Sequence, residues 1–458
     1  MNSNPSSLPR LFVTLVLALP VLMLNLANAR TSNQPAAHTT PDPALLAAIK
    51  QIKAIDHHAH PMRLVKDGEG DNESDALTLE GIEPFPLPVR LRPDNPEYIA
   101  AWKALYGYPY TDATEAHLRE LKELRRQVMS KQGDMYPAWV LDQLGIETMF
   151  ANRVAMGTGL QSPRFRWVSF VDALLLPLST KAARNINSDY CSFYLDEERL
   201  LKNYLASLGI KSLPATLDKY LATVVTPILE QQKRDGVVGV KFEAAYLRTL
   251  DFADADEADA KRIYANYVRG GEPPATEYKI LQDYLFRSIA REAGRLGLAV
   301  HIHTGIGIGA YFNVTGSNPL LLESALNDPT LRKTNFVLVH GGWPFSTQTT
   351  ALLTKPNVYV DFSAQTFLRQ PHELSLVIRQ WLEFVPEKVL FGTDAFGLVP
   401  EIGWEETGWL TTKTSRQALG MALTDMMNEG EITRDQALKL ARMVLRENTI
   451  NLYGFKTE

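Results

Sequence analysis

The sequence predicts a (β/α)8 barrel, because eight β-rich segments are separated by helical ones in a chain long enough for one large domain. The 458 residues are 45% hydrophobic and 22% charged, values typical of a globular protein with a large core. Strands that alternate with helices favour a parallel sheet, and eight of them favour closure into a barrel. An open doubly wound sheet is the weaker alternative.

The first thirty residues carry the pattern of an export signal. Arg10 precedes an uncharged apolar run at 11–26, and Ala27-Asn28-Ala29 provides the small residues that signal peptidase prefers. The run is shorter than the roughly 20 residues that a membrane span prefers. We therefore favour residues 1–29 as a cleaved signal peptide over a retained anchor. The mature chain would then work in the periplasm or outside the cell, with no stable membrane association.

The folded part is expected to begin at Asp42, after a tether at 30–41 that is rich in Ser, Thr, Asn and Pro. Asp42 followed by Pro43 fits the N-cap and first position of a helix. A strand then starts at Ala54 and ends in His57-His58-Ala59-His60-Pro61. Seven further segments are predicted as strands from their β-branched and aromatic content: residues 148–152, 167–172, 237–242, 299–303, 336–340, 358–361 and 389–391.

Helical segments lie between several of these strands. At 277–296, for example, leucine, isoleucine and alanine recur at helical spacing. Two stretches exceed a minimal barrel: residues 62–145, which are Pro-rich and then helical at 115–129, and residues 181–232, which are helical with a break at Pro214. We expect both to be helical insertions over the C-terminal mouth of a single barrel domain at 42–458.

Composition limits the partners. Lys and Arg total 47 against 52 Asp and Glu, and no long basic run is present, which argues against nucleic acid. The single cysteine, Cys191, can form neither an intrachain disulfide nor a thiolate metal site. Any metal must therefore be held by His and carboxylate side chains. The expected partner is a small-molecule substrate, and a homo-oligomer stays open.

Residues with metal-binding side chains are found where the predicted strands end. His58 and His60 are two apart on a strand, so both imidazoles point to the same side and could share a metal. His303 and His340 each end a later strand, and Asp394 follows the last one. In a parallel barrel those ends converge on one rim, where catalytic residues are found. We therefore predict a metal site of four histidines and one aspartate.

Two further residues face the same rim. His301 points inward like His303 but lies one layer deeper in the barrel. We therefore favour a catalytic role for His301, in which it supports a metal ligand or faces the substrate, over a role as a metal ligand. Lys241 ends an apolar strand. A buried lysine with a lowered pKa can react with CO2 to give a carbamate, whose two oxygens could bridge two cations. A salt bridge to Asp394 or Glu243 is the alternative.

Four loop residues are candidate substrate contacts. Arg153 and Arg248 could clamp a substrate carboxylate, since an Arg fork suits bidentate binding, but a surface salt bridge explains either residue equally well. Trp343 and Trp404, after the sixth and eighth strands, could wall a pocket. Ordinary packing of loop aromatics is the alternative for both.

The ends of the predicted strands carry five sequence motifs: Asp56-x-His58-x-His60-Pro61, Lys241-Phe242-Glu243-Ala244-Ala245-Tyr246, His303-Thr304-Gly305, His340-Gly341-Gly342 and Leu390-Phe391-Gly392-Thr393-Asp394-Ala395. These motifs resemble the amidohydrolase superfamily, in the branch called amidohydrolase 2, and residues 447–454 are similar to the closing helix of that family. The resemblance implies a distorted barrel with one or two divalent metal ions, commonly zinc. His58, His60 and Asp394 would hold the first metal, and His303 and His340 the second, with carbamylated Lys241 as the bridge.

The reaction that follows is hydrolysis of an amide, lactam or ester bond by a metal-activated water, with Asp394 taking the proton and returning it to the leaving group. Two alternatives stay open. Nonoxidative decarboxylation uses the same metal scaffold. The decarboxylases of the branch lack a lysine that matches Lys241, so the presence of Lys241 favours hydrolysis. A periplasmic solute-binding protein is a different class, which would usually show two similar lobes and has no need of Asp394 beside four histidines.

Overall fold

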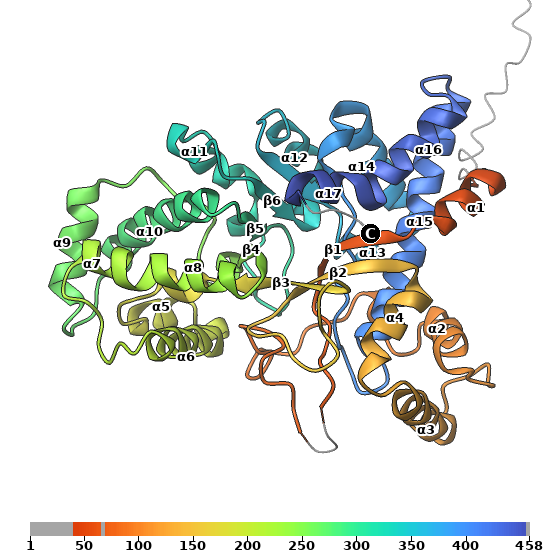
Figure 1. Cartoon of the computed structure of the whole chain (residues 1–458), viewed down its shortest axis with the longest axis horizontal. Helices are drawn as coiled ribbons and strands as arrows, with labels where there is room; N and C mark the ends of the chain where they lie inside the picture. The colour runs from red at the N-terminus through yellow and green to blue at the C-terminus, as the bar shows by residue number, and fades with distance from the viewer. Residues whose placement is uncertain (1–39, 66–68, 455–458) are drawn as a thin grey trace, which may run out of the picture. The chain divides into compact units, whose positions relative to one another are not determined.

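The structure is a computed structural model that describes residues 40–65 and 69–454 (Figure 1). The expected signal peptide at 1–29 and nearly all of the tether at 30–41 lie outside the described residues. Within the described part of the chain, no helix is both long enough and apolar enough to cross a membrane.

Eight parallel strands form a single sheet in which each strand pairs with the next one along the chain. An open doubly wound sheet would show a reversal of strand order, which is absent from this sheet. The predicted (β/α)8 barrel and all eight predicted strands are therefore confirmed. The strands are β1 (Ala54–Ala59), β2 (Ile146–Asn152), β3 (Phe165–Phe170), β4 (Val237–Phe242), β5 (Ala299–His303), β6 (Phe336–Val339), β7 (Val358–Asp361) and β8 (Val389–Leu390).

Backbone hydrogen bonds join the turn after β8 to β1. His57 N donates to Phe391 O at 2.9 Å, Asp394 N donates to His58 O at 2.7 Å, and His60 N donates to Ala395 O at 2.8 Å. The segment after β8 therefore runs alongside the end of β1. This pairing brings Asp394 next to His58 at the end of β1 and His60 just beyond it.

Amphipathic helices pack against the outside of the strands. The predicted helix at 277–296 is present as α10 (Ala275–Arg295), and its apolar stripe is buried against β5. Similarly, α8 (Thr226–Arg234) packs on β4 and α4 (Tyr136–Leu144) packs on β2. The other helices between or after strands are α9 (Glu257–Tyr267), α11 (Glu323–Leu326), α12 (Ser346–Leu352), α13 (Gln365–Leu368), α14 (Pro371–Phe384), α15 (Trp404–Asn428) and α16 (Arg434–Arg442).

The first helix begins where the sequence predicts. In α1 (Pro43–Gln51), the Asp42 side chain accepts a hydrogen bond from Leu45 N at 2.7 Å, and proline occupies the first turn. Asp42 also forms an ion pair with Arg434 at 2.7 Å. The cap therefore fixes the helix start and ties it to α16.

The insertion between β1 and β2 has an irregular part and a helical part. Its helices α2 (Pro96–Tyr106), α3 (Glu115–Gln132) and α4 (Tyr136–Leu144) contact one another (Figure 1), and α3 contains the helix predicted at 115–129. The described residues of 62–88 form neither helix nor strand. The second insertion contains α5 (Lys181–Ile186), α6 (Cys191–Ser207), α7 (Leu217–Tyr220) and α8 (Thr226–Arg234), with Pro214 in the break before α7.

The C-terminal helix α17 (Asn448–Tyr453) ends in a tyrosine that contacts two histidines of the barrel. Its Tyr453 Oη lies 2.6 Å from His57 Nε2 and 2.5 Å from His301 Nε2. The same ring packs in a small apolar cluster with Ile55, Phe150 and Val168. A buried hydroxyl therefore links two buried histidines that come from opposite sides of the barrel.

Candidate metal centre

The first group of side chains consists of His58, His60 and Asp394. Asp394 Oδ1 lies 3.2 Å from His58 Nε2 and 3.5 Å from His60 Nε2. Two ligands bound at 2.0–2.1 Å to one tetrahedral zinc ion lie roughly 3.3 Å apart. The Asp394 oxygen therefore has, to each of the two ring nitrogens, the separation of two atoms that share a cation.

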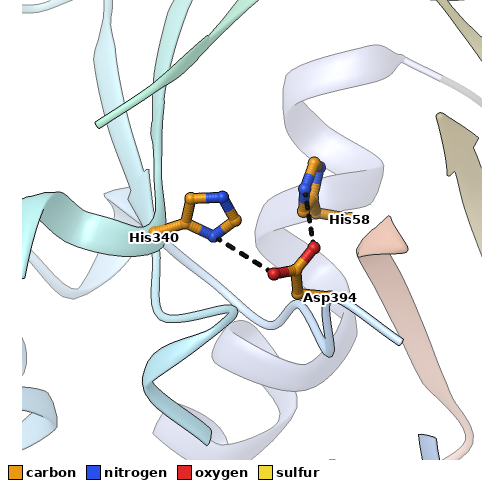
Figure 2. A group of neighbouring side chains, drawn as sticks. All are labelled: His58, His340 and Asp394. Carbon is orange, nitrogen blue, oxygen red and sulfur yellow. Dashed lines mark ion pairs between the residues drawn. The ribbon is translucent and has the colours of Figure 1, made fainter. Parts of the chain in front are cut away.

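Asp394 lies between two histidine rings. Figure 2 shows one carboxylate oxygen directed at His58 and the other at His340, whose Nδ1 is 3.9 Å away. One ligand atom from each of these three residues can be chosen so that all lie within 4.8 Å of one another. The carboxylate is thus placed to contact both groups of histidines.

The second group is the pair His303 and His340. His340 Nε2 lies 3.2 Å from His303 Nδ1. Ser363 Oγ donates to Asp361 Oδ1 at 2.5 Å, so it accepts from the protonated His340 Nδ1 at 2.9 Å. The Ile306 carbonyl can only accept, and it does so from His303 Nε2 at 3.2 Å. The nitrogens that face each other therefore both carry lone pairs.

Two lone pairs at this distance repel unless a cation lies between them. Burial lowers the pKa of His58, His303 and His340 well below the ordinary value for histidine, and the charge of Lys241 acts in the same direction. The rings are therefore neutral, which is the form that binds metal. The donor set fits a divalent cation at each of the two histidine groups.

Asp75 orients the ring of His60. Asp75 Oδ2 lies 2.7 Å from His60 Nδ1, which leaves His60 Nε2 free to face Asp394. Carboxylates that bind the distal nitrogen of a metal-ligating histidine fix its tautomer and its orientation. The sequence analysis missed Asp75 because it lies in a segment without periodicity or motif. The sequence analysis also missed Asp361, whose Oδ1 accepts hydrogen bonds from His340 N and Ser363 Oγ. Asp361 ends a predicted strand, so the position at a strand end that pointed to His303 could have pointed to it.

Lys241 has an unusual environment for an ammonium group. Its Nζ is buried, makes no hydrogen bond with the described residues, and has Glu243 Oε1 as its nearest carboxylate at 3.8 Å. Asp394, the other expected salt-bridge partner, is not within ion-pair distance in the described part of the chain. A buried charge without hydrogen bonds is costly, so this lysine fits a modified or metal-facing group better than a simple salt bridge.

Burial also raises the pKa of Asp394 to about 7, although the charges of His60 and Lys241 lower it. A divalent cation beside the carboxylate would favour the anion, because bound ions are the largest local charges in a site. The described side chains around Asp394 therefore do not provide enough positive charge to keep its carboxylate ionised, and a bound metal ion would provide it.

Two of these residues have strained backbones. His340 has a φ of 68° and Asp394 a φ of 56°, in the left-handed region that residues other than glycine seldom adopt. Such conformations concentrate at functional sites, where the surrounding structure holds them. Asp56 contributes here, because its carboxylate accepts from Thr393 N at 2.9 Å and Thr393 Oγ1 at 2.5 Å and so fixes the turn that presents Asp394.

A cavity of about 750 Å³ opens directly above these groups. This volume is within the range of sites that bind small molecules. Irregular residues of the first insertion form much of its wall, as expected for an insertion over the mouth, whereas the second insertion contributes Phe193. The metal-binding and charged residues of the barrel that line it are His60, Lys241, Glu243, His303, His340 and Asp394.

His301 lies below the site and does not line the cavity. Its ring stacks on His57 with 4.5 Å between ring centres, and its Nε2 bonds Tyr453. A Cβ at Gly239 would come within 2.9 Å of this ring, so a glycine is needed there. These contacts place His301 in the barrel interior, where it supports the site from outside the cavity lining.

The four expected substrate contacts also lie outside the cavity lining. Arg153 is fully buried and holds Asp71 through two hydrogen bonds of 2.8 Å, which anchors the first insertion to the end of β2. Arg248 is bound to the side chain of Asp283 on α10 at 2.5 Å. Trp404 is buried at the start of α15, and Trp343 is half-buried. The guanidinium groups of Arg153 and Arg248 already have carboxylate partners, and neither tryptophan lines the cavity, so the alternatives of ion pairing and of ordinary packing describe all four residues.

An eight-stranded parallel barrel with neutral histidines, a lysine and an aspartate at the carboxyl ends of its strands defines a metal-dependent barrel enzyme. The family model described as Amidohydrolase matches residues 55–455. The chain belongs to the amidohydrolase family. It is therefore an enzyme of a family that uses divalent metals, and the solute-binding alternative is excluded.

Solved structures and one curated protein resemble the chain. A metal-dependent hydrolase from Lactobacillus casei has a TM-score of 0.58 at 18% identity and covers 91% of this chain and 98% of its own. Uronate isomerase from Thermotoga maritima has a TM-score of 0.59 at 14% identity, with 90% and 96% covered. These identities show the fold alone. Protein fluG of Emericella nidulans is 28% identical over 229 residues, which are 47% of this chain and 25% of that protein. The match therefore spans about a quarter of that protein.

Proposed function

We propose that this protein hydrolyses an amide, lactam or ester bond of a small molecule. The observation that carries the proposal is the position of Asp394, whose Oδ1 lies 3.2 Å from His58 Nε2 and 3.5 Å from His60 Nε2 while its carboxylate borders the cavity. A bound divalent metal, most simply zinc, lowers the pKa of a coordinated water and polarises a carbonyl oxygen.

The chain's own residues would hold the metals and move the proton. His58, His60 and Asp394 would hold the first metal, and His303 and His340 the second. Water supplies a hydroxyl to the acyl carbon, the bond from that carbon to nitrogen or oxygen breaks, and Asp394 carries the water's proton to the leaving atom. The products are a carboxylic acid and an amine or alcohol.

Lys241 would bridge the two metals as a carbamate. Its buried Nζ, which makes no hydrogen bond in the described protein, supports this role, since addition of CO2 replaces a buried cation with an anion between two cations. Metal analysis should then give close to two metals per chain. Lys241→Ala should lose much of the second metal together with activity, partly restored by short carboxylic acids. A content of one metal per wild-type chain would contradict the proposed carbamate bridge. The proposed hydrolysis would then proceed at a single metal.

The decisive test of hydrolysis compares wild type with Asp394→Asn at matched metal occupancy, on a panel of neutral amides, lactams and esters. Asn keeps the shape and one oxygen but cannot accept a proton, so kcat should fall about 10²-fold to 10⁴-fold with substrate affinity little changed. Unchanged turnover with metal fully bound would refute the proton role. Products of decarboxylation or of isomerisation, found without any hydrolysis of the panel, would refute the proposed reaction.

We also propose that the protein is exported and acts in the periplasm or outside the cell. The apolar run at 11–26 and the small residues Ala27 and Ala29 support this. Fractionation of the producing cells, with detection of the activity outside the cytoplasm, tests it.

A further inference from the structure

We infer that the substrate is a neutral molecule with a large apolar group attached to the cleaved bond. This inference rests on the proposed hydrolysis and names its substrate class. It comes from the wall of the cavity, whose volume of about 750 Å³ far exceeds the space that a single amide or ester group fills.

The wall above the metal-binding residues is mostly apolar, although Ser74, Asp75, Thr78 and Glu83 also line it. One side is a proline-rich stretch at 82–88 of the first insertion, and the other sides are loops that follow β5, β7 and β8. Pockets of this kind bind ligands through apolar contact, and a few polar groups fix the ligand's orientation. The large apolar side chains of the wall include Leu79, Phe85, Leu87, Phe193, Phe312 and Phe396.

The charges that line the cavity disfavour an anionic substrate. Four carboxylates, those of Asp75, Glu83, Glu243 and Asp394, face it. Lys241 is the one lysine or arginine among the described lining residues, and the carbamate proposed there would be a further anion. A substrate carboxylate or phosphate away from the metals would find no partner there, and an unpaired charge is costly to bury. A sugar acid or a dicarboxylic acid derivative would therefore be a poor substrate.

The mouth of the cavity has exposed apolar side chains. Leu79 is 48% exposed and Met62 is 37% exposed, and both line the cavity. Large apolar side chains around a concave site mark a surface that binds apolar ligands. Leu79 can therefore be replaced without disturbing the core, and it is placed to contact the outer part of a long substrate.

The experiment uses the zinc-loaded enzyme and a series of neutral p-nitroanilides with acyl chains from acetyl to octanoyl. Each added methylene should raise kcat/KM by up to about fourfold, the equivalent of one buried methylene, until the cavity is filled. A terminal carboxylate on the hexanoyl chain should lower kcat/KM more than about tenfold. Equal or better hydrolysis of the acetyl or the carboxylate compound would overturn the inference and leave hydrolysis standing.

A matched pair of variants tests the wall itself. Leu79→Gln should lower the ratio of kcat/KM for the octanoyl compound to kcat/KM for the acetyl compound by about fourfold or more. Leu376→Gln is the control, because Leu376 on α14 is 49% exposed and does not line the cavity. Equal effects of the two variants on the octanoyl compound would overturn the assignment of this wall.

Binding is measured separately from catalysis. N-phenyl-1-naphthylamine, a neutral fluorescent probe, should bind wild type and be displaced by N-alkyl amides more strongly as the alkyl chain lengthens. If displacement follows chain length but none of the anilides or the corresponding esters is cleaved, the apolar site stands and the proposed hydrolysis fails. If displacement is independent of chain length, the apolar site is refuted whatever the activity.

Discussion

Removal of the Asp75 side chain should weaken zinc binding at the first group of ligands. Asp75 holds His60 Nδ1 at 2.7 Å, so in Asp75→Ala the ring can rotate or take the other tautomer, which withdraws Nε2 from the site. Loss of such a partner typically costs 10-fold to 100-fold in metal affinity or activity. The contact is partly exposed, 14% for His60 and 27% for Asp75, so solvent screens it and we expect about tenfold, or about 1.4 kcal/mol.

The assay is competition for zinc with a chromophoric chelator, combined with kcat and KM at saturating zinc. Asp75→Asn keeps an oxygen acceptor without the charge and should fall between wild type and Asp75→Ala. Glu80→Ala is the control, since Glu80 is exposed in the same segment and makes no ion pair with the described residues. If Asp75→Ala binds zinc as tightly as the control, Asp75 does not orient His60 and the reasoning fails.

Four other results are expected. Tyr453→Phe should lower the free energy of unfolding in urea by about 1–3 kcal/mol, because two buried histidine nitrogens lose their hydrogen-bond partner. An unchanged urea midpoint would show that these nitrogens have another hydrogen-bond partner in the variant. Asp71→Asn should lower it by about 3–5 kcal/mol, since Arg153 stays buried and charged, and a loss under 1 kcal/mol would contradict this. Burial raises the pKa of Asp71, but hydrogen bonds, chiefly from Arg153, outweigh burial and hold the pKa below its ordinary value. The wild-type pair should therefore stabilise the fold above about pH 4 and lose that contribution as the pH falls further. A free energy of unfolding that is constant down to about pH 2 would refute this contribution of the pair. Mass spectrometry of exported protein should find Arg30 at or near the N-terminus, and a retained leader on a membrane-bound product would contradict the cleavage.

Much of the fold could be predicted because it is encoded locally. The alternation of short β-rich runs with helical periodicity is a property of neighbouring residues, and it predicted all eight strands and α10. The parity of His58 and His60 and the positions of His303, His340 and Asp394 at strand ends are equally local. Parallel closure then brings such ends to one rim, so a set of site residues could be named from sequence positions alone.

The rest depended on contacts between segments that no local pattern connects. Arg153 follows a strand, as a substrate clamp would, but packing of the first insertion gives it Asp71 as a buried partner. His301 has the parity of a site residue, yet α17 provides Tyr453 beneath it.

Asp75 lies in an aperiodic segment, and only the fold places it against His60. The sequence by itself determined the barrel and the donor atoms offered to a metal. The tertiary structure decided which nitrogen each histidine presents and how apolar the cavity above is, because both depend on which distant side chains fill the space around the rim.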